Sequence, residues 1–166
     1  MILNNFKKTL IGSILSVTST AMGSGSNPTD TVFVDGTVDN ITQSNYWSNY
    51  QLGFNKISTT PESMYSHIGV GSGNTAPTAD DYNLENELTS LTCTSASMSN
   101  TSEMSKQFTA TFSNQTGEDV TVKEVGWFVS SYYSTTKTKL FERTVLDTPV
   151  TIPNGESRAF TVEISM

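Results

Sequence analysis

The chain has 166 residues, a formal charge of −7 at pH 7 and a hydrophobic fraction of 35%, which is the size of one domain with a thin core. Its 23 Ser, 26 Thr and 13 Asn residues favour strands and turns over a bundle of helices. A single cysteine excludes an internal disulfide and a multi-thiolate zinc site, and a single histidine excludes a His-rich metal site. No apolar run is long enough for a bilayer-spanning helix, and an acidic chain is a poor general ligand for nucleic acid. We therefore expect no cofactor, no nucleic-acid partner and no membrane partner.

Residues 1–17 carry apolar side chains at helical spacing. The steps between these side chains are 3, 4, 4 and 3 residues, which places them on one stripe of a helix; they are Leu3, Phe6, Leu10, Ile14 and Val17. We interpret the stripe as the docking face of an amphipathic helix. The alternative is a cleaved secretory signal, since two lysines precede the apolar stretch and small residues surround Ala21. A Gly/Ser-rich linker ends near residue 30, so we divide the chain into an N-terminal helix and flexible arm (1–30) and a β-sandwich domain (31–166).

Short strand-like segments follow the linker. The sequence predicts strands over Thr31–Val34, Tyr46–Phe54 and Met64–Val70, each bounded by Gly, Asn, Asp or Pro. The middle segment is aromatic, and we expect its rings to pack in the core or between subunits. The alternative interpretation is a sugar-binding platform. Together with the helical stripe, these rings make up the predicted docking interface; they belong to Tyr46, Trp47, Tyr50 and Phe54.

The second half of the chain shows clearer alternation of apolar and polar residues. It predicts strands over Leu88–Thr94, Gln107–Phe112 and Leu140–Val145, and a last strand that contains Phe160, Val162 and Ile164. Polar turns are expected over 114–119 and at the segment that ends with Gly155. A loop tip is expected over 130–138, where Tyr132 and Tyr133 could contact a partner.

One strand changes its phase partway along. Val120 and Val122 share one face, whereas Val125, Trp127 and Val129 keep the opposite phase. A β-bulge near residues 123–124 would let both sets face the core. Short strands separated by turn residues are typical of all-β domains. We therefore predict an antiparallel β-sandwich, immunoglobulin-like or jelly-roll-like, preceded by the amphipathic helix and arm.

Two segments resemble ligand sites. Residues 69–75 resemble a phosphate-binding loop but lack its Gly-Lys-Ser/Thr ending, so we interpret them as a flexible turn whose glycines adopt positive φ. The densest acidic cluster comprises Asp80, Asp81, Glu85 and Glu87, without the spacing of an EF-hand. We interpret Asp81 as part of a cap with Thr78 on a short helical turn. Calcium binding by residues 80–87 stays open as the alternative.

The residue types and their spacing do not favour nucleophilic catalysis. His67 lies beside Ser66, and neighbours on a strand point to opposite faces, so the two make a poor catalytic couple. Cys93 has no histidine near it in sequence. We expect both residues to be structural, no catalytic or metal-binding residues, and a protein that is not an enzyme.

Three segments, taken in order, resemble a group of virion structural proteins of tailed bacteriophages. Residues 68–88 are similar to its G-x-G-x-x-x-P-T-x-x-D-x-x-L-E stretch, and residues 111–128 to its F-x-N-x-T-G-x-x-x-x-V-x-E-x-G-x-F strand pair. Residues 140–157 resemble its L-x-x-R-x-x-L-x-x-P-V-x-I-x-x-G-x-S stretch. The resemblance implies a non-enzymatic virion component, and it offers no catalytic residues to transfer to this chain.

These observations lead to one functional expectation and one main alternative, and a hydrolase whose site leaves no signal in residue spacing stays open as a further alternative. We expect a structural subunit on the virion exterior, as a capsid decoration, collar or tail-attached protein that docks through its N-terminal region. Its partners would be other virion proteins and further copies of the same chain, because symmetric sites on a particle favour homo-oligomers such as a trimer. The alternative is a secreted or surface adhesive module that binds carbohydrate, which would require the signal interpretation of residues 1–22.

Overall fold

The computed structural model describes residues 29–32, 34–36, 38–41, 56–61, 65–102, 105–133 and 135–165. These residues form an all-β structure, and none of them lies in a helix that could cross a membrane. The strands are β1 (Thr29–Val32), β2 (Val38–Ile41), β3 (Ser66–Gly71), β4 (Thr92–Ser102), β5 (Ser105–Ser113), β6 (Val120–Tyr133), β7 (Thr135–Ile152) and β8 (Ser157–Ser165).

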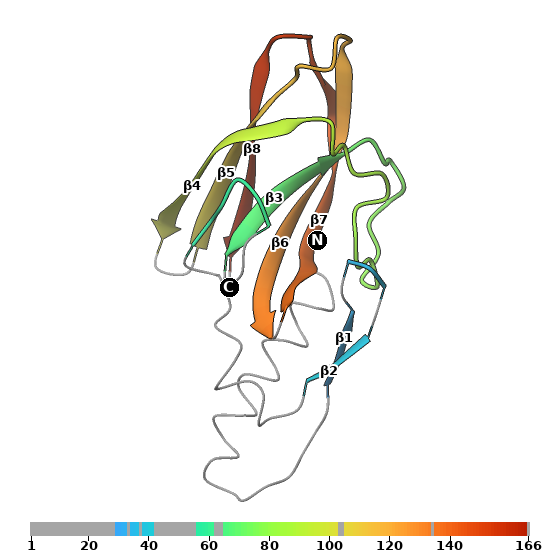
Figure 1. Cartoon of the computed structure of the whole chain (residues 1–166), viewed down its shortest axis with the longest axis vertical. Coiled ribbons are helices and arrows are strands. Elements are labelled where there is room, and N and C mark those ends of the chain that lie inside the picture. Colours follow the sequence, from blue (N-terminus) through green and yellow to red (C-terminus); the bar gives the residue numbers. More distant parts are fainter. Residues whose placement is uncertain are drawn as a thin grey trace, which may run out of the picture.

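Two antiparallel three-stranded sheets make up most of the described structure (Figure 1). One sheet has the strand order β3-β6-β7 and the other has the order β4-β5-β8, while β1 and β2 form a separate hairpin. Alternate residues of both sheets meet in one hydrophobic core, as the predicted alternation requires. The buried members of this core are Ile68, Val70, Leu91, Phe108, Ala110, Phe112, Val122, Val125, Trp127, Val129, Phe141, Ile152, Phe160, Val162 and Ile164.

The pairing of β6 with β7 is irregular where the bulge is predicted, and the extra residues lie on β7. The register of β6 against β7 shifts between Val122 and Glu124. Val122, Val125, Trp127 and Val129 are buried, and Val120 packs against the core partly buried. The prediction that both sets face the core is therefore confirmed for the buried members. On the partner strand, four residues lie between the paired Val145 and Val150. Pro149 is one of them, which suits a residue that cannot donate to a ladder.

Two turns at one end of the molecule join the sheets (Figure 1). The β5–β6 turn contains Asn114, whose Nδ2 donates to the carbonyls of Glu118 and Ile152 at 2.8 Å each. Gly117 and Gly155 have φ of 93° and 83°, where glycine carries no Cβ penalty. The Gly117 N–H donates to Asn154 Oδ1 in the β7–β8 turn at 2.9 Å. Both predicted turns are confirmed, and they are linked to each other.

Several strand boundaries differ from those predicted. The first strand ends at Val32, and Val34 instead lies in the β1–β2 turn, where its N–H donates to the Thr138 carbonyl. The fourth strand starts at Thr92, because Leu88 lies beside β3 and donates to the Val70 carbonyl. The predicted loop tip over 130–138 is the end of the β6–β7 hairpin, where the strands run to Tyr133 and resume at Thr135. In the first two cases a backbone hydrogen bond joins the residue to a distant segment, and in the third the pairing of β6 with β7 continues through the predicted loop.

The predicted docking interface falls on residues that the structure does not describe. The N-terminal helix and most of the linker lie outside the described residues, and so does the predicted strand Tyr46–Phe54. The same holds for every residue of the predicted interface, which remains a prediction; these are Leu3, Phe6, Leu10, Ile14, Val17, Tyr46, Trp47, Tyr50 and Phe54.

Candidate functional site

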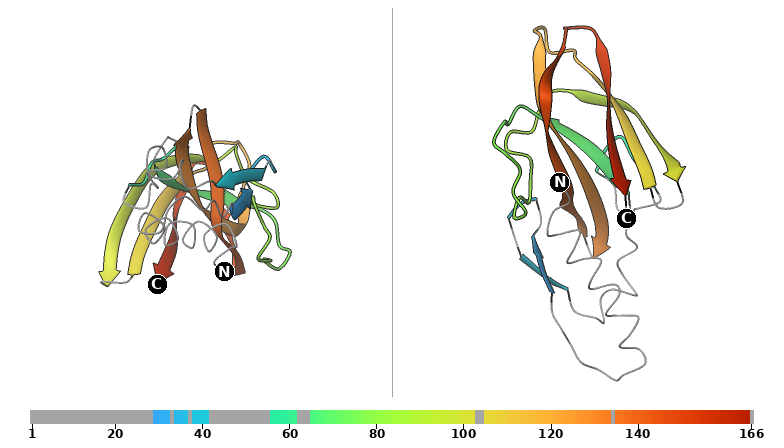
Figure 2. Two further views of the ribbon diagram at one scale, coloured as in Figure 1. Left: turned by 90° about the horizontal axis from the view of Figure 1, so that it is seen from below. Right: turned by 180° about the vertical axis from the view of Figure 1, so that it is seen from behind.

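The outer face of the β3-β6-β7 sheet is covered by the connection between β3 and β4. This connection, residues 72–91, runs along that side of the molecule (Figures 1 and 2). Leu84 from the connection packs with Phe128 and Leu140 of the sheet in a second buried cluster, and Val34 of the β1–β2 turn packs against it. The sheet therefore has apolar contacts on both faces.

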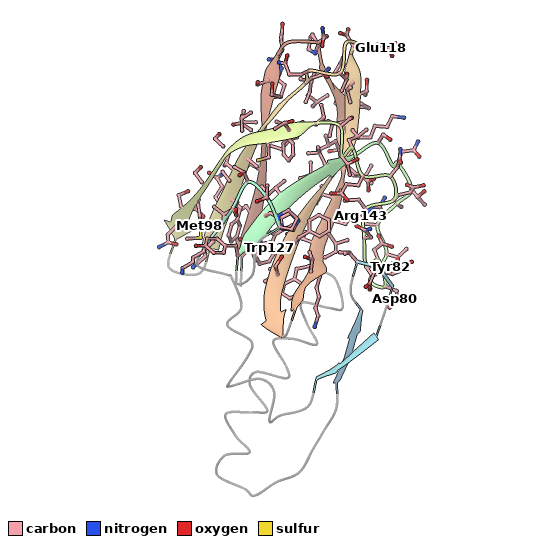
Figure 3. The ribbon with its side chains drawn as sticks, in the orientation of Figure 1. Asp80, Tyr82, Met98, Glu118, Trp127 and Arg143 are labelled. Carbon is pink, nitrogen blue, oxygen red and sulfur yellow. The ribbon has the colours of Figure 1, made fainter. Side chains whose placement is uncertain are left out.

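A buried guanidinium holds the connection to the sheet. Arg143 on β7 donates from Nε to Glu124 Oε2 at 2.7 Å and from Nη1 to Asp81 Oδ2 at 2.8 Å. Its Nη2 donates to Glu85 Oε2 at 3.3 Å. The side chain of Arg143 is 3% exposed and that of Glu124 is 0% exposed. We name these four residues the Arg143 cluster; Figure 3 shows Arg143 beside the connection that carries Asp80 and Tyr82.

Glu124 also binds the backbone of the connection. Its carboxylate accepts the N–H groups of Gly73 at 3.0 Å, Glu85 at 3.2 Å and Asn86 at 2.9 Å. A buried carboxylate needs such partners, because burial without them is costly. One side chain on β6 thus satisfies three backbone donors of the connection and the guanidinium of β7.

Hydrogen bonds shift the pKa values of Asp81, Glu85 and Arg143. Burial by itself would raise the pKa of Asp81, but hydrogen bonds from Thr78 and Arg143 outweigh burial and hold that pKa below its ordinary value. Hydrogen bonds from Thr75 lower the pKa of Glu85. Burial opposes the charge of Arg143, yet its hydrogen bonds to Glu124 and Asp81 raise the pKa of the guanidinium. Each group is therefore held in its charged form.

The glycine-rich segment has a different role from the one predicted. Gly69 and Gly71 lie within β3, and the described glycines with positive φ are elsewhere, so the flexible-turn interpretation is wrong. A Cβ on Gly71 would lie 2.7 Å from the Asn86 carbonyl oxygen and inside contact distance of a Glu124 carboxylate oxygen. A Cβ on Gly73 would lie 2.6 Å from the same oxygen. The glycines make room for the Glu124 carboxylate.

The predicted acidic cluster is partly brought together. Asp81 accepts the Thr78 N–H at 3.1 Å, which is one half of the predicted capping box, on a turn and not on a helix, and it also accepts the Thr78 hydroxyl at 2.7 Å. The carboxylates of Asp81 and Glu85 bind Arg143. The backbone of Glu87 forms an isolated antiparallel β-bridge with Gly71 of β3. Within the described part of the chain, no three His, Cys, Asp or Glu side chains are placed to hold a metal ion.

A cavity of about 550 Å³ opens beside the Arg143 cluster. The connection, the β1–β2 turn and Arg143 line it, and Tyr82 stands at its wall with 44% of its surface exposed. Many of its polar groups already bind the protein: Asn83 donates to the Val34 carbonyl at 3.3 Å, and Thr75 donates to Glu85 at 2.6 Å. The arrangement is suited to holding the turn and the connection together.

His67 and Cys93 lie on strands, as predicted for structural residues. His67 on β3 is buried and stacks on Phe128, with ring centroids 4.9 Å apart. Its Nδ1 has no hydrogen-bond partner among the described residues. The Ser66 hydroxyl donates to the Lys56 carbonyl at 2.7 Å, so its proton is used in a hydrogen bond to the backbone. Cys93 is half-buried on β4, and burial raises the pKa of its thiol.

Stability should depend on pH through His67. Burial lowers the pKa of His67 from 6.5 to about 4. Between these values the unfolded chain binds a proton that the folded protein does not bind, so stability falls as pH decreases from about 6.5 to about 4. The loss is at most roughly 3 kcal/mol. Urea unfolding at several pH values measures it. A His67→Phe variant retains a ring against Phe128 and should lose this slope; an equal slope in both proteins contradicts the assignment.

Each of the three segments that resemble phage virion proteins in sequence contributes a residue to the Arg143 cluster. Asp81 and Glu85 come from the first segment, Glu124 from the second and Arg143 from the third. Sequence reasoning had singled out Asp81 and Glu85 but neither Glu124 nor Arg143 as site residues. Comparisons of the chain with protein-family models, curated proteins and solved structures give no match.

Proposed function

We propose that the protein is a non-enzymatic structural component of a tailed-bacteriophage virion, an exterior capsid-decoration, collar or tail-attached subunit. The supporting observation is the convergence of the three resembling segments. Several of their shared positions contact one another: Gly71 and Gly73 border the Glu124 carboxylate, and Arg143 binds that carboxylate. Chance similarity between turns would not by itself select residues that contact one another across three segments.

The chemistry of the Arg143 cluster supports a structural role. A catalytic acid or base must be able to reach a substrate proton. In this cluster Arg143 binds three carboxylates, and Glu124 is fully buried beneath the connection. These charges hold segments of the chain together. We include in the proposal an immunoglobulin-like or jelly-roll-like β-sandwich that forms homo-oligomers, such as trimers, on the particle.

Mass spectrometry of purified virions tests the proposal. The chain should co-purify with particles through a density gradient, and its copy number should match a symmetric site. Hundreds of copies would indicate a capsid decoration, and a small multiple of three or six would indicate the neck or tail. A chain that is absent from particles contradicts the proposal. A chain found in the medium with its N-terminus cut near Ala21 would instead favour the adhesive alternative.

The predicted amphipathic stripe supplies a second test. A Leu10→Asp change places a charge on the stripe and should reduce incorporation into particles about tenfold or more, because burial of one such side chain is worth ~1.5–3 kcal/mol. The β-domain should keep its thermal unfolding midpoint. Ser16 lies off the stripe, so Ser16→Asp is the matched control and should be incorporated normally. Equal incorporation of both variants, or a mature chain that starts after residue 20, contradicts the docking-helix interpretation.

A further inference from the structure

Strand β4 forms one edge of the β4-β5-β8 sheet. It pairs with β5 along residues 92–102, and β5 pairs with β8 on its other side. Two views agree that β4 is the outermost strand of this sheet (Figures 1 and 2). Among the described residues, no backbone group of Ala96–Asn100 has a hydrogen bond on the side away from β5, and the Ser95 carbonyl accepts one from the Cys93 thiol at 3.4 Å. Every second residue of this stretch therefore presents its N–H and C=O groups outward.

The β4 edge lacks common features that prevent strands from pairing. Its eleven residues contain no charged side chain and no proline. By contrast, β8 at the opposite edge carries Arg158 and Glu163, and the β3 edge receives backbone hydrogen bonds from Ser58 and Leu88. Charges and covering segments are usual ways to prevent edge-to-edge pairing. Register shifts occur only near the ends of β4, so a regular stretch remains over Ser95–Asn100.

Charge also favours an encounter at this sheet. Its three strands carry Lys106, Arg158 and Glu163, a net charge of +1, whereas the whole chain carries −7. Two copies of an acidic chain repel each other over most of their surfaces, and they can approach where the charge is small. On the inner side of β4, Cys93 and Met98 pack against the core but stay half-buried. A strand added beside β4 would cover them further.

We propose that β4 pairs with β4 of a second copy of this chain, antiparallel about a two-fold axis near Ser97. Ser97 is the middle residue of the strand and is exposed. The pairing joins two three-stranded sheets into one of six strands and satisfies the outward backbone groups of both copies. It does not depend on the virion assignment.

The test uses the full chain with single substitutions at the axis. Ser97→Lys and Ser97→Glu each place two like charges close together across the axis, which should weaken dimerisation about tenfold or more. An equal mixture of the two variants places opposite charges there and should restore the dimer. Thr161→Lys on the β8 edge is the matched control and should leave dimerisation unchanged. Sedimentation between about 1 µM and 1 mM covers the range expected of a small interface.

Four results would overturn the proposal. The unmodified chain does not associate through the tested range, or Ser97→Lys associates as tightly as it does. The mixture of Lys and Glu variants fails to restore association, or Thr161→Lys weakens it as much as Ser97→Lys. Far-UV circular dichroism and thermal unfolding confirm that each variant is folded. If the chain also associates through another surface, the Ser97 variants should still reduce the assembly mass by half.

Discussion

Replacing Arg143 by methionine should lower the free energy of unfolding by about 3–5 kcal/mol, because it leaves the buried Glu124 carboxylate without its guanidinium. Asp81 and Glu85 would also lose their common partner, so the connection over 72–91 should loosen from the sheet. Urea denaturation measures the first effect. Amide hydrogen exchange at Gly73, Glu85 and Asn86, whose N–H groups bind Glu124, measures the second.

An exposed ion pair in the same protein provides the control. Arg158 binds Glu156 at 2.8 Å, but both side chains are about half exposed. Arg158→Met should therefore change the unfolding free energy by no more than about 1 kcal/mol. Adding Glu124→Gln to Arg143→Met should recover part of the loss, since no uncompensated charge is then buried. If Arg143→Met and Arg158→Met lose the same free energy of unfolding, the Arg143 cluster does not stabilise the fold as described.

Replacing Gly71 by alanine should destabilise the protein by about 1–3 kcal/mol or more, because the added methyl group overlaps the Glu124 carboxylate and the Asn86 carbonyl. Both neighbours are held in place, the first by the Arg143 cluster and the second by a hydrogen bond from Ser72. The steric overlap can therefore be relieved only if the connection over 72–91 moves away from β3. Urea unfolding gives the loss, and hydrogen exchange should show faster exchange in residues 72–91 than in the β4-β5-β8 sheet.

A Gly117→Ala variant distinguishes the effect of steric overlap from that of backbone strain. A Cβ at Gly117 would meet no atom within 4 Å, yet its φ of 93° is unfavourable for other residues. Gly117→Ala should cost about 1 kcal/mol from strain and leave the exchange of residues 72–91 unchanged. If Gly71→Ala has no larger effect than Gly117→Ala, the Glu124 carboxylate does not approach β3 as described.

Local features of the chain were predictable from the sequence. The alternation of Phe108, Ala110 and Phe112 identified β5, and the change of phase after Val122 located the register shift between β6 and β7. Gly117 and Gly155 marked the turns between sheets. These signals involve residues a few positions apart, because side chains alternate along a strand and a turn needs particular backbone angles. They were therefore visible without knowledge of the fold.

The Arg143 cluster could not be predicted in the same way. Arg143 meets Asp81 and Glu85 across 62 and 58 positions, and Glu124 meets Gly73 across 51. These contacts depend on the strand order β3-β6-β7 and on the registers at both sides of β6. A shift of one residue in either register would turn Glu124 or Arg143 to the other face of the sheet. Sequence alone therefore identified the acidic residues of the connection but not their partners.

The same reasoning explains why the glycines were misinterpreted. Gly71 and Gly73 resemble a flexible turn when only their neighbours in the chain are considered. In the fold they are small because Glu124 lies against them. Local patterning determines where strands and turns form, since those preferences act between near neighbours. The packing of distant segments determines which polar side chains become buried together, because burial requires all their hydrogen-bond partners at once.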